Sequence, residues 1–184
     1  THESAWTADI DVELAFKVVK RAAGNALVGA DFAANIRDYV NRDEHVDFIL
    51  RLIKKYNLFY VEDPVCANDA EGYKIIKEQS NCIVVGDDLI SGQLNRLKKF
   101  ANCINGVIIK PNQAGTVSTC LKLIKFARTH GIVPIVSHRS ADTENTAVCR
   151  LAQYAPIAKL GAAGLRIVRL NQLIRMWEEA EKPK

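Results

Sequence analysis

The chain has 184 residues, of which 48% are hydrophobic and 25% are charged, a balance typical of one globular domain with a sizeable core. Its net charge of +4 is spread along the chain and does not form the basic stripe of a nucleic-acid-binding protein. No apolar run is long enough to span a bilayer, and the first residues lack the basic head and apolar core of an export signal. We therefore expect a single domain over residues 1–184, located in the cytoplasm, with no nucleic-acid or membrane partner.

The chain alternates between segments of helical periodicity and short apolar runs. Apolar residues recur at helical spacing within 14–22, 46–53 and 117–124. The short runs cover 26–30, 58–61, 82–85, 106–109, 133–136 and 157–160. Continuously apolar strands are typical of a parallel sheet buried on both faces, and their alternation with helices indicates right-handed crossovers. The sequence thus predicts an α/β fold of about six βα units.

A chemically capable side chain stands at the carboxyl end of each predicted strand. Consecutive members of this set are 21 to 31 residues apart, about one βα unit. The set consists of Asp31, Glu62, Asp87, Lys110, His138 and Lys159. Because the carboxyl ends of parallel strands gather on one face, where barrels and open α/β sheets carry their active sites, we expect these side chains to share one pocket mouth.

The acids and lysines of this set indicate proton abstraction assisted by a metal. Asp31, Glu62 and Asp87 offer only oxygen ligands, which suits a hard cation such as Mg²⁺. Beside such a cation, Lys110 or Lys159 would shift towards the neutral form that acts as a base, while the metal would stabilise the charge developing on a substrate carboxylate. Singly, each acid could instead be a helix cap or half of an ion pair, and each lysine a surface residue.

The segment 137–140, which reads SHRS, follows the fifth predicted strand. Arg139 can hold a phosphate or carboxylate through two parallel hydrogen bonds, and Ser140 adds a hydroxyl. Neighbouring side chains at a strand end diverge, so Ser137 and His138 are not expected to act as a nucleophile–base pair. The segment therefore favours an anion-binding role over hydrolase chemistry.

Five segments contain the most distinctive motifs of the chain. They read VEDP at 61–64, VGDDL at 85–89, KPNQAGT at 110–116, SHRSADTENT at 137–146 and RLNQLIR at 169–175. In these residues, in their order and nearly in their spacing, the chain resembles the enolase family. The resemblance implies an enolase-type (β/α) TIM barrel, here without the N-terminal α+β domain and the early barrel strands. It also implies a homodimer formed through that N-terminal region.

The resemblance implies a reaction and assigns roles to five residues. The reaction is the Mg²⁺-dependent dehydration of 2-phosphoglycerate, a small phosphorylated acid, to phosphoenolpyruvate in glycolysis and gluconeogenesis. Asp31, Glu62 and Asp87 correspond to the ligands of the higher-affinity Mg²⁺. Lys110 corresponds to the general base that takes the C2 proton, and Glu3 to the general acid that assists loss of the C3 hydroxyl.

The same resemblance assigns four substrate-binding residues. His138 would contact the substrate near its leaving group. Arg139 and Ser140 would hold the phosphate, and Lys159 would hold the substrate carboxylate.

The sequence also departs from the family pattern. The Glu-Gly-Gly of the general-acid loop reads Glu3-Ser4-Ala5, and the loops at 160–166 and between Asp31 and Glu62 are short. Six strands are fewer than the eight that close a barrel, so we expect the chain to need a further polypeptide segment for stability or activity. Two alternatives stay open: an acid dehydratase with another substrate, and a non-catalytic interaction protein derived from an enolase.

Overall fold

The chain folds as one continuous α/β array. The computed structural model describes residues 11–36, 41–139, 143–161 and 164–181. The strands are β1 (Gly29–Asp31), β2 (Tyr60–Glu62), β3 (Ile83–Gly86), β4 (Gly106–Ile109), β5 (Val133–Ser137) and β6 (Ile157–Lys159). The helices are α1 (Val12–Ala23), η1 (Ala34–Ile36), α2 (Arg42–Tyr56), α3 (Ala70–Gln79), α4 (Leu94–Phe100), α5 (Pro111–Ala114), α6 (Val117–Thr129), α7 (Ala147–Ala152), η2 (Gly164–Arg166) and α8 (Ile167–Ala180). Every predicted apolar run overlaps a strand.

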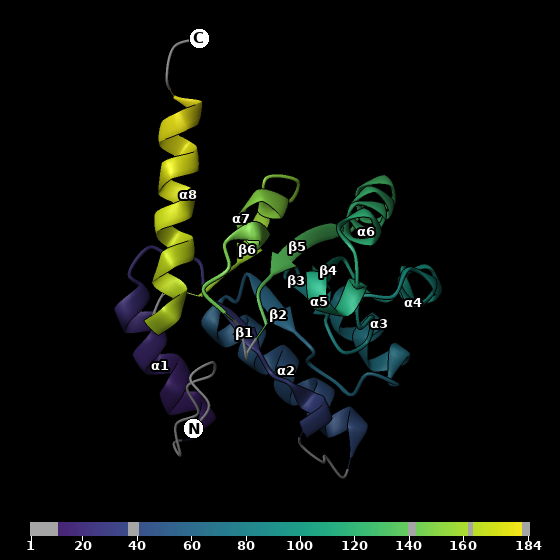
Figure 1. The fold of residues 1–184 in the computed structure, drawn as a ribbon. Coiled ribbons are helices and arrows are strands. Elements are labelled where there is room, and N and C mark those ends of the chain that lie inside the picture. The colour runs from purple at the N-terminus through teal and green to yellow at the C-terminus, as the bar shows by residue number, and fades with distance from the viewer. Residues whose placement is uncertain (1–10, 37–40, 140–142, 162–163, 182–184) are drawn as a thin grey trace.

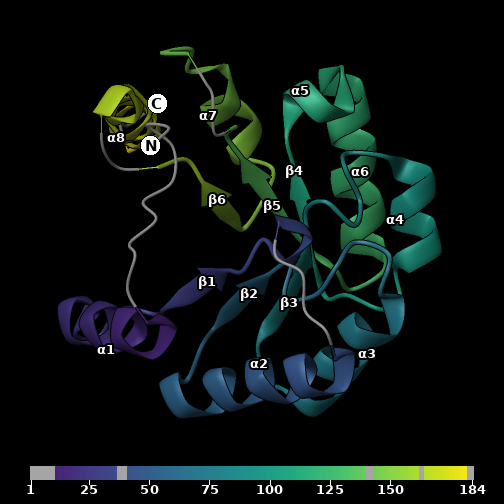
Figure 2. The same ribbon diagram turned by 90° about the horizontal axis from the view of Figure 1, so that it is seen from below.

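All six strands are parallel and lie in the order of the sequence, β1 to β6. Figure 1 shows them from one side, and Figure 2 shows them as an arc with α2, α3, α4, α6 and α7 on its outer side. Sequential parallel strands with helices on the outside are the arrangement of a (β/α) barrel. Among the described residues β1 and β6 each pair with a single strand, so the arc is six consecutive strands of such a barrel.

Apolar side chains cover both faces of the sheet, as the unalternating strand sequences predict. The outer face packs under the helices and includes Val61, Val84 and Val136. The inner face holds a smaller cluster of Val85, Ile108 and Ile135. Neighbours in a strand point to opposite faces, which is why Val84 and Val85 belong to different clusters.

Gly106, the first residue of β4, is required by close packing on the inner face. A Cβ at this position would lie 2.6 Å from Ile83 Cγ2 and 2.7 Å from Val85 Cγ2. Those distances are shorter than side chains tolerate, so the branched residues of β3 fill the space that the glycine leaves.

Helix α1 forms where its periodicity predicts, but its apolar face is only partly covered. Asp11 caps it by accepting a hydrogen bond from the Leu14 N–H at 3.0 Å. Phe16 is buried and stacks on Tyr56 of α2 with ring centroids 5.0 Å apart. Leu14 and Val18 are 48% and 57% exposed. Among the described helices, none is both long and apolar enough to cross a membrane.

Candidate active site

The structure places all six predicted strand-end residues at the carboxyl ends of the strands. Asp31 and Glu62 are the last residues of β1 and β2 and are direct partners in the register of the two strands. Asp87 and Lys110 directly follow β3 and β4. Lys159 ends β6, opposite Ser137, and His138 directly follows that serine. The loops and strand ends of one face therefore carry the whole set.

Lys159 joins three strands by ion pairs. Its Nζ lies 2.8 Å from Asp31 Oδ2 and 2.7 Å from Glu62 Oε2. Glu62 is only 1% exposed, and its Oε2 also accepts a hydrogen bond from the Tyr60 hydroxyl. A buried carboxylate is costly unless it is paired and hydrogen-bonded, and here both conditions are met.

In Glu62 and Lys159, burial and ion pairing shift the pKa in opposite directions. Burial raises the pKa of the Glu62 carboxyl, and Lys159 partly offsets that rise. Burial alone would lower the pKa of Lys159, but Glu62 and Asp31 outweigh it and raise the lysine pKa above its ordinary value. With these partners Lys159 is held as an ammonium, which suits binding of a carboxylate.

Asp87 and Lys110 form a second pair at the next two strand ends. Lys110 Nζ donates a hydrogen bond to Asp87 Oδ2, and the side chains of Lys110 and Asp87 are 16% and 11% exposed. Asp87 Oδ1 is buried, and among the described residues it accepts no hydrogen bond. An unsatisfied buried acceptor is costly and a cation would satisfy it, so Asp87 offers an oxygen of the kind that Mg²⁺ prefers.

The electrostatic neighbourhood of Tyr60 connects the two pairs. Burial raises the pKa of its phenol, and Glu62, Asp31 and Asp87 each raise it further, in that order. All three predicted metal ligands therefore act on one hydroxyl. The tightest carboxylate cluster among the described residues is a different one, Asp63, Asp87 and Asp88, whose ligand atoms lie within 4.8 Å of one another.

Asp63 had no assigned role in the sequence analysis, although it stands in the VEDP segment. Both of its oxygens accept hydrogen bonds: Oδ1 from the Tyr73 hydroxyl at 2.6 Å and the Asp87 N–H at 2.9 Å, and Oδ2 from the Asp88 N–H at 2.9 Å. Burial raises its pKa to about 6, against the lowering effect of Tyr73 and the two N–H groups. The lone pairs of Asp63 are largely in use, which favours a supporting role over direct metal ligation.

His138 is fixed by the carbonyl of Lys159. Its ring Nδ1 lies 2.7 Å from that oxygen, and its backbone N–H donates to the same oxygen at 3.0 Å. A carbonyl only accepts, so Nδ1 carries the proton and Nε2 of the neutral ring is an acceptor. Burial, followed by the charge of Arg166, lowers the pKa of His138 to about 4, so the ring is neutral near pH 7.

Of the remaining predicted site residues, the described part of the chain includes Arg139 alone. Arg139 directly follows His138 and is exposed at the same face. Ser140 and Glu3, and with Glu3 the departures Ser4 and Ala5, lie outside the described residues.

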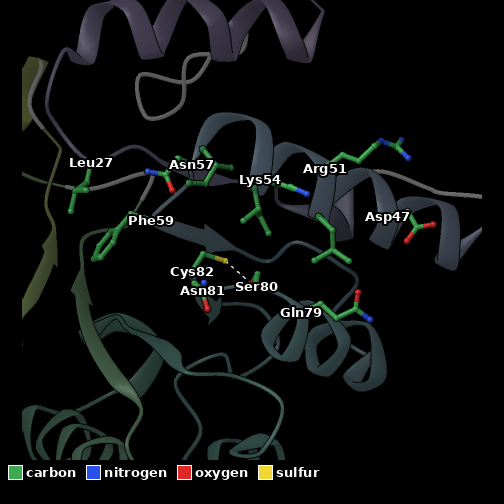
Figure 3. A pocket seen from close by; sticks show the side chains of 13 residues that line it. Leu27, Asp47, Arg51, Lys54, Asn57, Phe59, Gln79, Ser80, Asn81 and Cys82 are labelled. Carbon is green, nitrogen blue, oxygen red and sulfur yellow. Dashed lines mark hydrogen bonds between the residues drawn. The ribbon is translucent and has the colours of Figure 1, made fainter.

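Two cavities lie at different ends of the strands. A cavity of about 630 Å³ is at the amino ends of β2 and β3, lined in part by Arg51 and Lys54 of α2 and by Cys82, whose contact with Ser80 is drawn in Figure 3. A smaller cavity of about 320 Å³ lies on the inner face of the sheet and includes Asp31, Tyr60 and Lys159. The smaller cavity therefore holds part of the residue set described above, whereas the larger one lies away from the carboxyl strand ends.

Together, the fold and the site define part of a (β/α)-barrel protein with acids and lysines at the carboxyl ends of consecutive strands. A sequence model of a known family, described as "Enolase, C-terminal TIM barrel domain", matches residues 19–183. The chain belongs to the enolase family.

Curated relatives agree with this assignment. The enolase of Picrophilus torridus is 35% identical over an alignment of 202 positions, which covers 96% of this chain and 50% of that protein. The enolase of Methanosphaera stadtmanae is 43% identical over 148 residues, covering 77% of this chain and 36% of that protein. The enolase of Halobacterium salinarum is 36% identical over an alignment of 203 positions, which covers 97% of this chain and 51% of that protein. The chain spans about half the length of these relatives or less.

Proposed function

We propose that this chain carries the base, the metal ligands and the carboxylate-binding lysine of a Mg²⁺-dependent lyase that dehydrates 2-phosphoglycerate to phosphoenolpyruvate. The observation that carries the proposal is a set of contacts at the carboxyl ends of the strands. Lys110 contacts Asp87 there, and Lys159 contacts Asp31 and Glu62. Curated relatives that are named enolase support it.

The cation would be held by Asp31, Glu62 and Asp87, whose oxygens suit Mg²⁺. Bound there, it would supply Lewis-acid stabilisation of the charge that develops on the substrate carboxylate. The proton chemistry falls to side chains. The Lys110 amine takes the C2 proton, the C2–H electron pair forms the C2–C3 double bond, and the C3 hydroxyl leaves as water with a proton from Glu3.

The other residues bind and orient the substrate. Lys159, kept charged by Glu62 and Asp31, is suited to pair with the substrate carboxylate. The neutral ring of His138 offers Nε2 as an acceptor for a hydroxyl near the leaving group. Arg139 and Ser140 would hold the phosphate, since a guanidinium can make two parallel bonds to it.

The test is turnover of 2-phosphoglycerate by the complete folded protein that contains this chain, with and without Mg²⁺, followed by ultraviolet absorbance of the enol product. We expect Lys110→Met to lower kcat by roughly 10²–10⁴-fold, as loss of a general base does. Lys98→Met, which removes an exposed lysine of α4, is the matched control and should leave kcat unchanged. A complete, folded protein that contains this chain, binds Mg²⁺ and gives no turnover would contradict the proposal.

Ligand competition distinguishes the proposal from the other dehydratases of the superfamily. Calorimetric titration should show tighter binding of phosphate-bearing acids than of sugar acids. Tighter binding of sugar acids would favour the alternative of an acid dehydratase with another substrate. Folded protein that binds neither the metal nor the acids would favour a non-catalytic interaction protein.

A further inference from the structure

The buried carboxylate of Asp63, directly after β2, joins that strand end to the end of β3 and to helix α3. Asp63 is 3% exposed and follows Glu62 directly. Its side chain accepts from the backbone N–H groups of Asp87 and Asp88, both at 2.9 Å. A third donor is the hydroxyl of Tyr73, a fully buried residue of α3, at 2.6 Å. The loop that begins with Asp87 is thereby tied to the segment that ends with Glu62.

The backbone of Asp63 also bonds to β3, and it adds a bond to the segment after β1. Its N–H donates to Val85 O at 3.0 Å, and its carbonyl accepts from the Ala34 N–H, beyond β1, at 3.1 Å. Its φ is +41°, a left-handed conformation that costs energy for most residues and is least costly for Gly, Asn and Asp. Strained residues persist where the surroundings over-determine them, and such positions cluster at functional sites.

We propose that Asp63 is a positioning residue that sets the backbone of Asp87 and thereby the affinity of the site for Mg²⁺. The inference rests on the proposed function, in which Asp87 is a metal ligand. Two oxygens of one rigid carboxylate hold two successive N–H groups, which fixes the direction in which the Asp87 side chain leaves the backbone. Groups that orient metal ligands in this way change metal affinity by about 10–100-fold when they are removed.

Asp63→Asn separates the carboxylate from the backbone strain. Asparagine tolerates the left-handed conformation almost as well as aspartate. Its amide has one oxygen, so its NH₂ must face one of the three donors that now converge on Asp63. Tyr73→Phe is the graded variant, because it removes one donor and leaves both N–H bonds in place.

The experiment measures the dissociation constant of Mg²⁺ by calorimetry and the Tm of the chain and its variants. We expect Asp63→Asn to weaken Mg²⁺ binding by 10–100-fold and Tyr73→Phe to weaken it by only about threefold. Amide hydrogen exchange without metal gives a second readout: exchange at Asp87 and Asp88 should be faster in Asp63→Asn. Ile124→Val, a buried change in α6, is the control that lowers Tm without altering Mg²⁺ binding.

Each outcome decides between roles. A lower Tm for Asp63→Asn with unchanged Mg²⁺ affinity would make Asp63 merely structural and overturn the inference. An equal loss of affinity in Ile124→Val would do the same, because the effect would then follow stability. If the folded wild-type chain bound no Mg²⁺ at all, the proposed metal site would fail and the inference would fall with it.

Discussion

Lys159 is the last residue of β6, and its Nζ lies 2.8 Å from Oδ2 of Asp31, the last residue of β1, although these strands are at opposite ends of the sheet. In a flat sheet, five strand spacings of about 4.8 Å would keep β1 and β6 roughly 24 Å apart. The ion pair therefore requires strong curvature, which Figure 2 shows. Curvature brings the carboxyl ends of the first and last strands to one site. The same curvature gives the sheet its barrel shape and forms the site.

Removing the Lys159 charge should destabilise the chain more than removing its exposed partner. Lys159→Met leaves Glu62, at 1% exposure, without a counter-charge, and Lys159 itself is partly solvated, so we expect a loss of about 2 kcal/mol. Asp31→Asn leaves the Glu62 pair intact and should cost less than about 1 kcal/mol. Urea unfolding in the presence of a chelator measures both. Equal losses for the two variants would contradict this account.

The sequence predicts the positions of strands and of strand-end chemistry well, for a physical reason. Buried parallel strands must be apolar on both faces, so the runs at 106–109 and 133–136 are distinct from the helices around them. A polar residue directly after such a run, such as Lys110, or one position further on, such as His138, can only lie at the carboxyl end of the strand. Side-chain alternation then fixes the face on which it lies.

The role of Asp63 and the covering of α1 could not be predicted in the same way. The bonds of Asp63 come from the backbone of a loop and from Tyr73 ten residues away, and its left-handed backbone leaves no sequence signal beyond an acid after Glu62. Periodicity predicts the α1 helix, but it does not say what packs on Leu14 and Val18, because a partner for that face is not encoded in the helix itself.

The charge of His138 should make stability depend on pH. Its pKa is about 4 in the folded chain and about 6.5 when unfolded, so between these values the unfolded state binds more protons. The free energy of unfolding therefore falls as pH drops from 6.5 towards 4, and the contribution of His138 is fully present above 6.5. Because the ring is only partly buried, we expect about 1 kcal/mol.

A variant that does not titrate isolates this effect from the nearby carboxylates. His138→Gln keeps a donor for the Lys159 carbonyl, but it cannot take up a proton. Urea unfolding at pH 7 and at pH 4.5 should show a smaller loss of stability for His138→Gln than for the wild type. A larger loss in the variant would mean that the ring is protonated in the folded state.

Mg²⁺ should stabilise the chain through the predicted ligands and not through the tighter acidic cluster. At a concentration one hundred times its dissociation constant, the cation should add about 2.7 kcal/mol to the free energy of unfolding. Glu62→Gln should remove this gain, because it deletes a proposed ligand. Asp88→Asn should keep it, since Asp88 belongs only to the cluster with Asp63 and Asp87. Thermal melts with Mg²⁺ and with chelator distinguish the two, and the reverse result would place the cation at Asp63, Asp87 and Asp88.

Arg169 of α8 should stabilise the segment that follows β5. Its side chain is 1% exposed, with Nη2 2.6 Å from Thr143 O and Nε 3.3 Å from Asn145 O. Arg169→Met has similar length but donates nothing, so both carbonyls lose a charged donor, and we expect a loss of about 2–3 kcal/mol. Arg175→Met, an exposed change on the same helix, should stay within about 0.5 kcal/mol. Urea unfolding measures the two, and amide exchange over 143–146 should rise only in Arg169→Met. Unchanged exchange there, with the stability lost, would mean that Arg169 stabilises α8 alone and does not hold the segment 143–146.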